Sequence, residues 1–394
     1  MSKQSASDLI GLARIAAPTL ANAETEQKNS FLSIFAQKIE EFTSDILDAN
    51  RQDLEQAERA RIAEHLIDRL RLDDSRLADL AAAVRQVAAL PDPIGQIIDS
   101  HPADAGFELA RMRVPLGVIG FIYESRPSVT ADAAALCIKS GNPVVLRGGR
   151  EAWQSNTALA AAAAEALAQA GLPGGCICHL QDASREETGR LIKDERLALI
   201  IPRGGPQLVR RVRSEASAAV LSHEHGNCHL YVDASADIEM AIGLACNGKM
   251  ARPAVCNALE KLLVNQQLAA SFLPTMAEQF AKGKVEMIGC EQTCRIIGSG
   301  CRPATEQDWH EEYLDLKIAI KVVANVDEAI EHINRYGSSH TDAICANDEK
   351  VCSTFLRQVD SASVMANVST RFADGVEYGL GAEVGISTGR LEPR

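Results

Sequence analysis

Residues 1–90 repeat apolar positions at the helical period. In the clearest stretch, the apolar side chains lie three or four residues apart, at Phe31, Ile34, Phe35, Ile39 and Phe42. This spacing predicts amphipathic helices, and a similar pattern over residues 66–84 predicts that the helical region continues. The run Leu90-Pro91-Asp92-Pro93 ends the region, because proline disrupts a helix interior.

The period changes after residue 108. Residues 109–114 alternate as a strand does, and the apolar run 117–122 predicts a buried strand. Three more apolar runs follow, separated by helical patterns, at 143–147, 176–180 and 197–201. The helix predicted over 157–170 has Ser155 or Asn156 as its N-cap. Such alternation predicts a parallel sheet with helices on both faces.

A second alternating region begins near Asp237. Its predicted helices cover 238–245, 268–282 and 327–336, and its predicted strands cover 259–264, 316–323 and 342–345. Glycine is frequent in the tail, residues 375–389, which predicts a loop. We therefore expect a second α/β domain after the first.

Composition and charge exclude several classes of function. With 394 residues, 46% of them hydrophobic, the chain is long enough for two or three domains. Its formal net charge of −13 argues against nucleic acids and anionic membranes as partners, and no stretch approaches the ~20 apolar residues of a membrane span. Eleven cysteines without a Cys-x-x-Cys pair, and a start without an apolar signal segment, predict a cytoplasmic protein with reduced thiols.

Candidate anion-binding loops follow two of the predicted strands. The usual dinucleotide fingerprint is absent, and residues 243–250 fail as a Walker A loop because Met250 stands where a hydroxyl is required. Instead, Arg147-Gly148-Gly149-Arg150 follows one buried strand, and Arg203-Gly204-Gly205 follows another. Ligands bind at the carboxyl ends of strands in open α/β sheets, and arginine beside glycine suits a phosphate. Solvated arginines on connecting loops remain the alternative.

One cysteine lies where a thiolate could form. Cys256, in Arg252-Pro253-Ala254-Val255-Cys256-Asn257, joins a predicted helix to a predicted strand, with Lys249 and Arg252 nearby. Cations lower the pKa of a thiol and make its thiolate available as a nucleophile. Most other cysteines fall on helices or strands and are expected to be buried, while Cys290, Cys294 and Cys301 fall on an irregular stretch. Cys228 is the rival nucleophile.

A cluster of histidines raises the alternative of a metal site. His223-Glu224-His225 puts two imidazoles on one face of an extended segment, and Cys228 and His229 follow. The segment is equally well explained as a polar loop that enters the strand 230–232. No fourth ligand has a recognisable spacing, so we assign no metal.

Several motifs, in order along the chain, together resemble one family. They are Arg113–Gly120, Tyr123-Glu124-Ser125-Arg126-Pro127, Leu146–Glu151, Ile201–Gly205, Gly226–His229, Arg252–Asn257, Ser369–Phe372 and Gly379–Glu383. This set is similar to that of the γ-glutamyl phosphate reductases, also called glutamate-5-semialdehyde dehydrogenases, of the aldehyde dehydrogenase superfamily. The resemblance covers nearly the whole chain.

The resemblance implies a fold and a division into domains. The expected α/β architecture is aldehyde-dehydrogenase-like, with a Rossmann-like nucleotide domain, a smaller catalytic domain and a short oligomerisation element. Residues 1–236 would form the NADP-binding domain with an oligomerisation hairpin near 95–115, and residues 237–365 the catalytic domain. Residues 366–394 would return to the nucleotide and oligomerisation region. Family members continue further, so the chain is expected to be truncated there, with a weakened homo-oligomer.

The resemblance also implies an activity and its residues. NADPH would reduce L-glutamyl 5-phosphate to L-glutamate 5-semialdehyde through a thioacyl group on Cys256, in the second step of proline synthesis from glutamate, with coupling to glutamate 5-kinase. Cofactor-binding residues would be Arg147, Gly148, Gly149, Arg150, Arg203, Gly204, Gly205 and Glu312. Ser125 and Asn257 would join Cys256 in catalysis, and the residues proposed to hold the anionic substrate are Arg126, Arg252 and Arg371.

One departure from the superfamily bears on the reaction. Oxidative relatives activate water with a glutamate, and the corresponding position falls near His223. Phosphate release and hydride delivery need no attacking water, which is consistent with a reductase. The alternatives are an oxidative aldehyde dehydrogenase and a non-catalytic, metal-binding relative.

Overall fold

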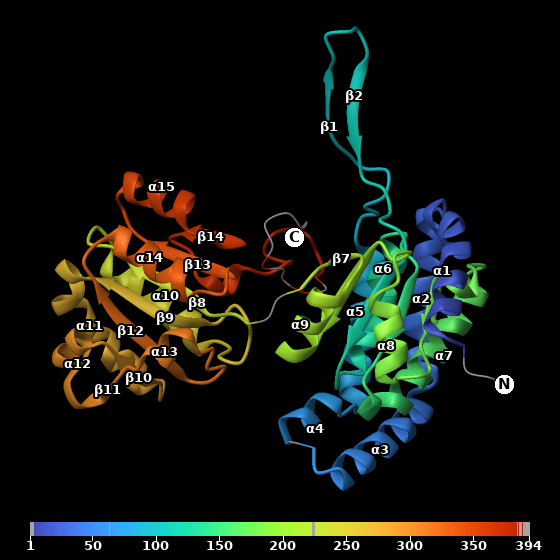
Figure 1. The fold of residues 1–394 in the computed structure, drawn as a ribbon, viewed down its shortest axis with the longest axis horizontal. Coiled ribbons are helices and arrows are strands. Elements are labelled where there is room, and N and C mark those ends of the chain that lie inside the picture. Colours follow the sequence, from blue (N-terminus) through green and yellow to red (C-terminus); the bar gives the residue numbers. More distant parts are fainter. Residues whose placement is uncertain (1–3, 63, 223–224, 384, 386–387, 389–394) are drawn as a thin grey trace. The chain divides into compact units, whose positions relative to one another are not determined.

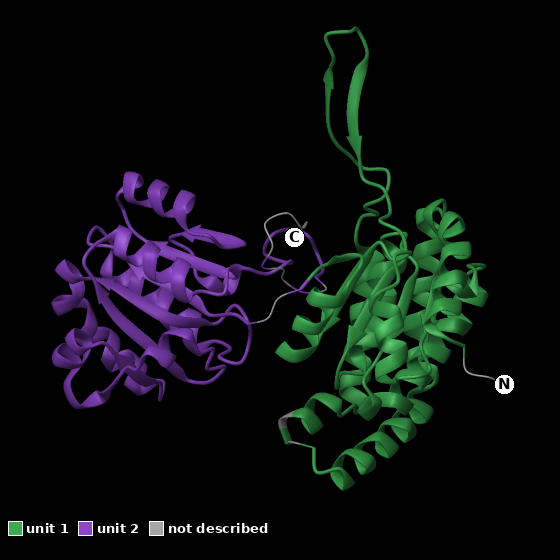
Figure 2. Cartoon of the chain, in the orientation of Figure 1, with its two compact units in different colours: residues 1–221 green, residues 222–394 purple. Residues whose placement is uncertain are grey.

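The computed structural model describes residues 4–62, 64–222, 225–383, 385 and 388. The chain divides into two compact units, residues 1–221 and residues 222–394 (Figure 2). The second unit therefore begins before residue 236, where the boundary was expected. The reason is the strand β8 (Cys228–Val232), which is buried along its length and hydrogen-bonded between β9 (Leu259–Asn265) and β13 (Thr341–Cys345) of the second unit.

Unit 1 begins with the helices that the apolar pattern predicts. They are α1 (Ala6–Ala21), α2 (Thr25–Glu41), α3 (Thr43–Arg59), α4 (Glu64–Leu70) and α5 (Asp74–Ala89). Phe31, Phe35 and Ile39 are all buried on one face of α2, which packs against α5 and α7 (Trp153–Gln169). The burial of this apolar face explains why the segment is helical and where it packs.

The sheet of unit 1 is parallel throughout. Its strands are β3 (Ile119–Tyr123), β4 (Val144–Arg147), β5 (Ile177–His179), β6 (Leu199–Arg203) and β7 (Ala219–Val220), in the order β5-β4-β3-β6-β7. The order therefore reverses between β3 and β6, as in a dinucleotide-binding sheet. The predicted Rossmann-like arrangement is confirmed.

Helices cover both faces of this sheet. α1, α8 (Arg185–Ile192) and α9 (Pro206–Glu215) bury Ile122 and Val145 on one face, and α6 (Ser128–Lys139) and α7 contact the strands as well. Short 3-10 turns, η1 (Arg150–Ala152) and η2 (Gly174–Cys176), precede α7 and β5.

The start of α7 differs from the prediction. The helix begins at Trp153, so neither Ser155 nor Asn156 is its N-cap. Instead the buried carboxylate of Asp53, on α3, accepts hydrogen bonds from the backbone amides of Gln154 (3.0 Å) and Ser155 (2.8 Å). The N-terminal amides of a helix need an acceptor, and here a residue distant in sequence supplies it.

A two-stranded antiparallel hairpin extends from unit 1 (Figure 1). It consists of β1 (Ile97–Pro102) and β2 (Glu108–Met112), in the region where a hairpin is expected. Its apolar side chains are exposed, and Ile97 and Phe107 retain 56% and 57% of their accessible surface.

Unit 2 contains a second parallel sheet of seven strands, in the order β11-β10-β12-β9-β8-β13-β14. The strands not yet given are β10 (Glu286–Gly289), β11 (Cys301–Pro303), β12 (Lys317–Val323) and β14 (Ser363–Ala366). The stretch with Cys290, Cys294 and Cys301 is therefore not irregular, because it forms β10, α12 (Glu291–Ile297) and β11.

Two groups of helices enclose this second sheet. α10 (Ile238–Met250), α11 (Gln266–Lys282) and α12 pack on one face, and α14 (Val326–Tyr336) and α15 (Glu349–Gln358) pack on the other. The short elements η3 (Gly298–Gly300), α13 (Glu306–His310) and η4 (Thr370–Phe372) complete the unit. No helix in the described part of the chain combines the length and the apolar character that a membrane crossing requires.

Candidate active site

The candidate anion-binding residues of unit 1 meet at one edge of its sheet. The loops after β3, β4 and β6 all leave the carboxyl ends of parallel strands, on both sides of the point where the strand order reverses. The backbone amide of Glu124 donates to the carbonyl of Arg203 (3.1 Å), and the amide of Gly205 donates to the Glu124 carboxylate (2.9 Å). The loops after β3 and β6 are thus joined where a dinucleotide site is expected.

Gly148 lets the backbone pass through a crowded part of this edge. A Cβ atom at position 148 would overlap the side-chain amide of Asn156, which is itself fixed by the buried hydroxyl of Thr130 (3.0 Å). Glycine is therefore required here for close packing. Gly148 and Gly149 are both buried.

The two arginines that flank this turn donate hydrogen bonds to the same backbone carbonyl. Arg147 donates to the Thr188 hydroxyl (2.9 Å) and to the Ala183 carbonyl (3.1 Å), and Arg150 donates to the same carbonyl (3.1 Å). Burial lowers the pKa of Arg147, and Glu151 and Glu124 oppose that shift. A guanidinium stays charged in a protein, so the edge carries two cations in a defined place.

Ser125 is held in an uncommon backbone conformation. Its φ angle is +46°, and both its amide (2.6 Å) and its hydroxyl (2.9 Å) donate to one carboxylate oxygen of Glu151. The hydroxyl proton is therefore already engaged. For Ser125 to donate to an oxyanion, Glu151 would have to release it. Arg126, the next residue, is exposed.

In unit 2, Cys256 lies half-buried on the loop between α10 and β9. Its carbonyl accepts a hydrogen bond from the Cys228 thiol (3.3 Å). A Cβ atom on Gly226 would overlap the main chain of Cys256, so glycine is required at that position. The loop that carries the candidate nucleophile is thus packed directly on the chain that enters β8.

The structure separates Cys256 from its rival. Cys228 is fully buried, and burial raises the pKa of its thiol well above the usual value. It is therefore a protonated thiol whose visible role is to support the Cys256 loop. Burial also raises the pKa values of Cys137 and Cys176 to about 12, as expected for space-filling cysteines. Cys246 and Cys352, also expected to be buried, are only partly so.

Asn257 fastens the same loop to the chain near η4. Its side-chain amide donates to the carbonyls of Arg371 (3.3 Å) and Ala373 (3.1 Å), and its own carbonyl accepts from the Thr370 hydroxyl (2.8 Å). These contacts make Asn257 a positioning residue. They also bring Arg371 beside the loop, on which Arg252 is exposed.

Glu312 contacts Gly226, the residue packed on the Cys256 loop. Its carboxylate accepts a hydrogen bond from the Gly226 amide (2.8 Å), and burial raises the pKa of Glu312. Unit 2 therefore brings together Cys256, Glu312 and Arg371, which are far apart in sequence.

A buried charge network that the sequence reasoning missed supports the Glu312 segment. Lys249 and Glu260 form a fully buried ion pair (3.1 Å), and Glu260 also accepts a hydrogen bond from the Tyr313 amide (3.1 Å). Lys261 donates to the Glu311 carbonyl (2.7 Å), and burial lowers the pKa of Lys261 to about 8. The signal in the sequence is the pair Glu260-Lys261 within an otherwise apolar strand, because buried charges require partners.

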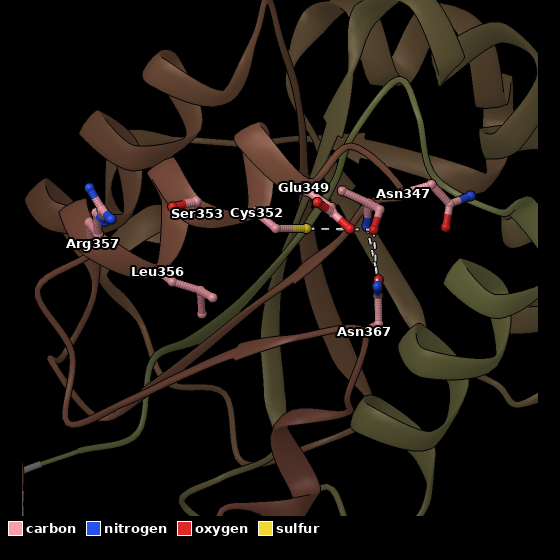
Figure 3. Close-up of a pocket in the computed structure, with 8 residues that line it drawn as sticks. Asn347, Glu349, Cys352, Ser353, Leu356, Arg357 and Asn367 are labelled. Atoms are coloured by element: carbon pink, nitrogen blue, oxygen red, sulfur yellow. Dashed lines mark hydrogen bonds between the residues drawn. The ribbon is translucent and has the colours of Figure 1, made fainter.

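A pocket of about 480 Å³ lies elsewhere in unit 2 (Figure 3). Helix α15 contributes Cys352 and Leu356, and the chain after β13 and β14 contributes Asn347 and Asn367. The Cys352 thiol donates to the Ala346 carbonyl (3.6 Å). None of the residues expected in catalysis lines this pocket, so it is distinct from the Cys256 region.

Comparisons with known proteins agree on the family. The aldehyde dehydrogenase family model matches residues 1–296. A crystal structure of γ-glutamyl phosphate reductase from Thermotoga maritima is 44% identical, with a TM-score of 0.95 over 99% of this chain and 94% of that one. The chain belongs to the aldehyde dehydrogenase family and, within it, to the γ-glutamyl phosphate reductases.

Two more structures extend the comparison. The γ-glutamyl phosphate reductase of Saccharomyces cerevisiae is 29% identical, with a TM-score of 0.53 over 96% of each chain. An engineered glycolyl-CoA reductase with bound NADP+ is 17% identical and shares the fold, with a TM-score of 0.65 over 98% of this chain and 91% of that one. As an aldehyde dehydrogenase family member, this protein is an oxidoreductase, and the family uses nicotinamide cofactors.

The histidine cluster of this reductase is described only in part, because His223 and Glu224 lie outside the described residues. His229 is fully buried, where its Nδ1 pairs with Asp342 (3.0 Å) and its ring packs edge-on against His332. Within the described ranges, no three histidine, cysteine or acidic side chains are placed to hold a metal ion.

Proposed function

We propose that this protein reduces L-glutamyl 5-phosphate to L-glutamate 5-semialdehyde with NADPH, releasing phosphate, in the second step of proline synthesis from glutamate. The observation that carries the proposal is the placement of Cys256. Its loop is packed on Gly226, fastened by Asn257 and supported by the Cys228 thiol. A half-buried cysteine on a loop held at three points is suited to act as a positioned nucleophile.

Cys256 performs the covalent step. Its thiolate attacks the acyl carbon of the substrate, a C–S bond forms, and the C–O bond to phosphate breaks with phosphate as the leaving group. Bound NADPH supplies the hydride that reduces this carbon. The tetrahedral adduct on Cys256 then expels the thiolate, and the semialdehyde is released. No water attacks in this sequence, so no general base for water is required.

The charged and polar residues expected to act with Cys256 have separate roles in this proposal. The substrate carries a phosphate and a carboxylate, which Arg126, Arg252 and Arg371 would hold by charge-assisted hydrogen bonds. The oxyanion would accept a hydrogen bond from the backbone amide of Cys256. Once Glu151 releases the Ser125 hydroxyl, that hydroxyl would donate a second one. Asn257 acts indirectly, by holding the loop.

The carboxyl edge of the unit 1 sheet fits the cofactor. Gly148 and Gly149 bring the main chain of the turn after β4 close to the side chains of Asn156 and Glu151. Arg147 and Arg150 place two cations at the same turn. The loop Arg203-Gly204-Gly205 adds a third cation, and the Glu124 carboxylate already accepts a hydrogen bond from its Gly205 amide (2.9 Å). These residues would hold the phosphates of NADPH, and Glu312 would contact the nicotinamide ribose. Arg150 is the residue on which a preference for the 2′-phosphate rests.

The assembly and the cellular context belong to the same proposal. The exposed apolar hairpin β1–β2 is suited to bury its side chains against another copy of the chain, which supports a homo-oligomer. None of the eleven cysteines, all of which lie in the described part of the chain, forms a disulfide, which supports the cytoplasm as the location. The acyl phosphate must come from a kinase that phosphorylates glutamate, so functional coupling to glutamate 5-kinase is expected.

The reverse reaction tests this function. Purified protein is assayed with L-glutamate 5-semialdehyde and NADP+, with and without inorganic phosphate, and formation of NADPH is followed. We expect strict dependence on phosphate, because phosphate must cleave the thioester. Oxidation without phosphate would instead identify an oxidative aldehyde dehydrogenase.

Two cysteine variants complete this experiment. Cys256→Ala should abolish the activity. Cys352→Ala is the control, because Cys352 is also half-buried but lies beside the separate pocket, and this variant should remain active. Activity that survives Cys256→Ala would refute the nucleophile.

A further inference from the structure

Three cysteines of unit 2 have no part in the proposed reaction. Cys290 caps the start of α12, Cys294 lies within that helix, and Cys301 begins β11, the edge strand of the sheet. The residues lie close together because β10, α12 and β11 form one compact turn of the chain. Their arrangement is sufficiently specific to suggest a chemistry of its own.

Cys294 and Cys301 face each other. Their sulfur atoms are 3.5 Å apart, and the Cys294 thiol also lies 3.4 Å from the Gly289 carbonyl. Position 289 has to be glycine, because a Cβ atom there would come within 2.6 Å of the Cys301 sulfur. The backbone of β10 therefore leaves the space in which the two thiols meet.

Cys290 is engaged in other contacts. Its sulfur lies 3.2 Å from the Thr293 hydroxyl and accepts hydrogen bonds from the Thr293 amide (3.5 Å) and the Val322 amide (3.4 Å). These contacts hold it at the start of α12. Of the three thiols, Cys294 and Cys301 are the pair joined by a sulfur–sulfur contact.

We propose that Cys294 and Cys301 form a reversible dithiol–disulfide site that reacts with low-molecular-weight disulfides. The Cys294 thiolate attacks one sulfur of the small disulfide, forms a mixed disulfide and releases one small thiol. The Cys301 thiolate then attacks the Cys294 sulfur and displaces the second small thiol. Two protein thiols are oxidised, and one disulfide is reduced to two thiols.

The order of these two steps follows from exposure. Cys294 is half-buried and open to a small reagent, whereas Cys301 is 8% exposed. Burial, together with the neighbouring Cys294 side chain, raises the pKa of Cys301 to about 12. Cys301 is therefore the resolving thiol, and closure of the disulfide should accelerate from neutral to alkaline pH.

The disulfide would tie α12 to the edge strand. α13 follows β11 in the chain and is also bonded to it. Arg302, next to Cys301, donates to the Asp308 carboxylate of α13 (2.8 Å). Tyr313, beyond α13, donates its hydroxyl to the same carboxylate (3.1 Å). Oxidation would therefore restrain the strand that precedes the segment carrying Glu312.

Peptide mapping tests this site directly. The full chain is incubated with glutathione disulfide, the remaining thiols are alkylated, and the protein is digested with trypsin. Cleavage after Lys284 and Arg295 yields two peptides, 285–295 with Cys290 and Cys294, and 296–317 with Cys301, since the Arg302–Pro303 bond resists trypsin. We expect these two peptides to be linked, and dithiothreitol to separate them.

Cysteine variants identify the pair. The link should persist in Cys290→Ser and in the distant control Cys352→Ser, and it should be lost in Cys294→Ser. Cys301→Ser should stop at a glutathione adduct on Cys294. The proposal is overturned if the wild-type chain yields no linked peptide, or if the link survives in Cys294→Ser. The wild-type result requires no variant to fold, and circular dichroism establishes the fold of each variant.

Discussion

Gly226 lies so close to the main chain of Cys256 that no side chain fits between them. The amide of the same glycine donates a 2.8 Å hydrogen bond to Glu312. One residue without a side chain therefore holds the proposed nucleophile in register with the proposed cofactor-binding carboxylate. Because both contacts involve the backbone of Gly226, the two groups cannot shift independently.

Replacement of this glycine should damage both folding and catalysis. Gly226→Ala forces the Cys256 loop to move, so we expect a loss of about 1–3 kcal/mol in the free energy of unfolding and a large decrease in kcat. Denaturant unfolding and steady-state kinetics measure the two effects. Gly243→Ala is the matched control, because an added methyl group on α10 meets no atom within 4 Å. An unchanged kcat in Gly226→Ala would show that the close approach is unimportant for catalysis.

The buried pair Lys249–Glu260 should be important for stability as a pair. Lys249→Met leaves the Glu260 carboxylate buried without its cation, and we expect a loss of about 3–5 kcal/mol in the free energy of unfolding. The double variant Lys249→Met with Glu260→Gln removes both charges and should recover part of that loss. Lys282→Met, at the exposed end of α11, serves as the control. Equal losses in the single and double variants would argue against coupling.

Arg371 should contribute to binding of the anionic substrate. Arg371→Ala keeps the main-chain carbonyl that Asn257 contacts, so the loop should remain in place. Loss of one charge-assisted contact predicts an increase in the KM for the semialdehyde of roughly 10–100-fold. The exposed Arg295, paired with Glu291 on α12, provides the control variant Arg295→Ala. An unchanged KM in Arg371→Ala would rule out this role.

Arg150 should contribute to the choice between the two nicotinamide cofactors. Arg150→Ser removes a cation from the turn after β4, and the KM for NADPH should increase about tenfold while the KM for NADH stays nearly constant. The measurement is the ratio of kcat/KM for the two cofactors. Arg14→Ser, an exposed change on α1, should leave that ratio unaffected. An equal change in kcat/KM for NADPH and NADH would show that Arg150 does not bind the 2′-phosphate.

Asp132 should make stability depend on pH. Burial raises the pKa of Asp132 to about 6, and Arg203 opposes this shift. The folded state therefore binds the proton more tightly than the unfolded state, and the associated stability is present below about pH 4 and lost as the pH rises through about 6. Because the Asp132 side chain is partly exposed, we expect this contribution to the free energy of unfolding to be about 1–2 kcal/mol.

Asp132→Asn removes this titration. Its unfolding free energy should vary less than that of the wild type between pH 4 and pH 6, and it should exceed the wild-type value at neutral pH. Denaturant unfolding across this pH range provides the measurement. Identical pH dependence in the two proteins would show that Asp132 titrates normally.

The sequence by itself determined the local elements and the chemistry on offer. Apolar spacing predicted the helices of residues 1–90 and most strands of both sheets, because periodicity reflects burial of one face and is a local property. Arginine beside glycine after β4 and β6 marked one edge of a sheet. The Arg252–Asn257 motif singled out Cys256.

Only the tertiary structure decided which elements and side chains meet. β8 belongs to the second sheet because its hydrogen bonds go to β9 and β13, and α7 starts at Trp153 because Asp53 on a distant helix caps it. Cys228 and Cys256 differ in burial and therefore in reactivity, and no local pattern encodes that difference. Hydrogen bonding between strands and desolvation depend on residues remote in sequence, so the assembled fold was needed to settle them.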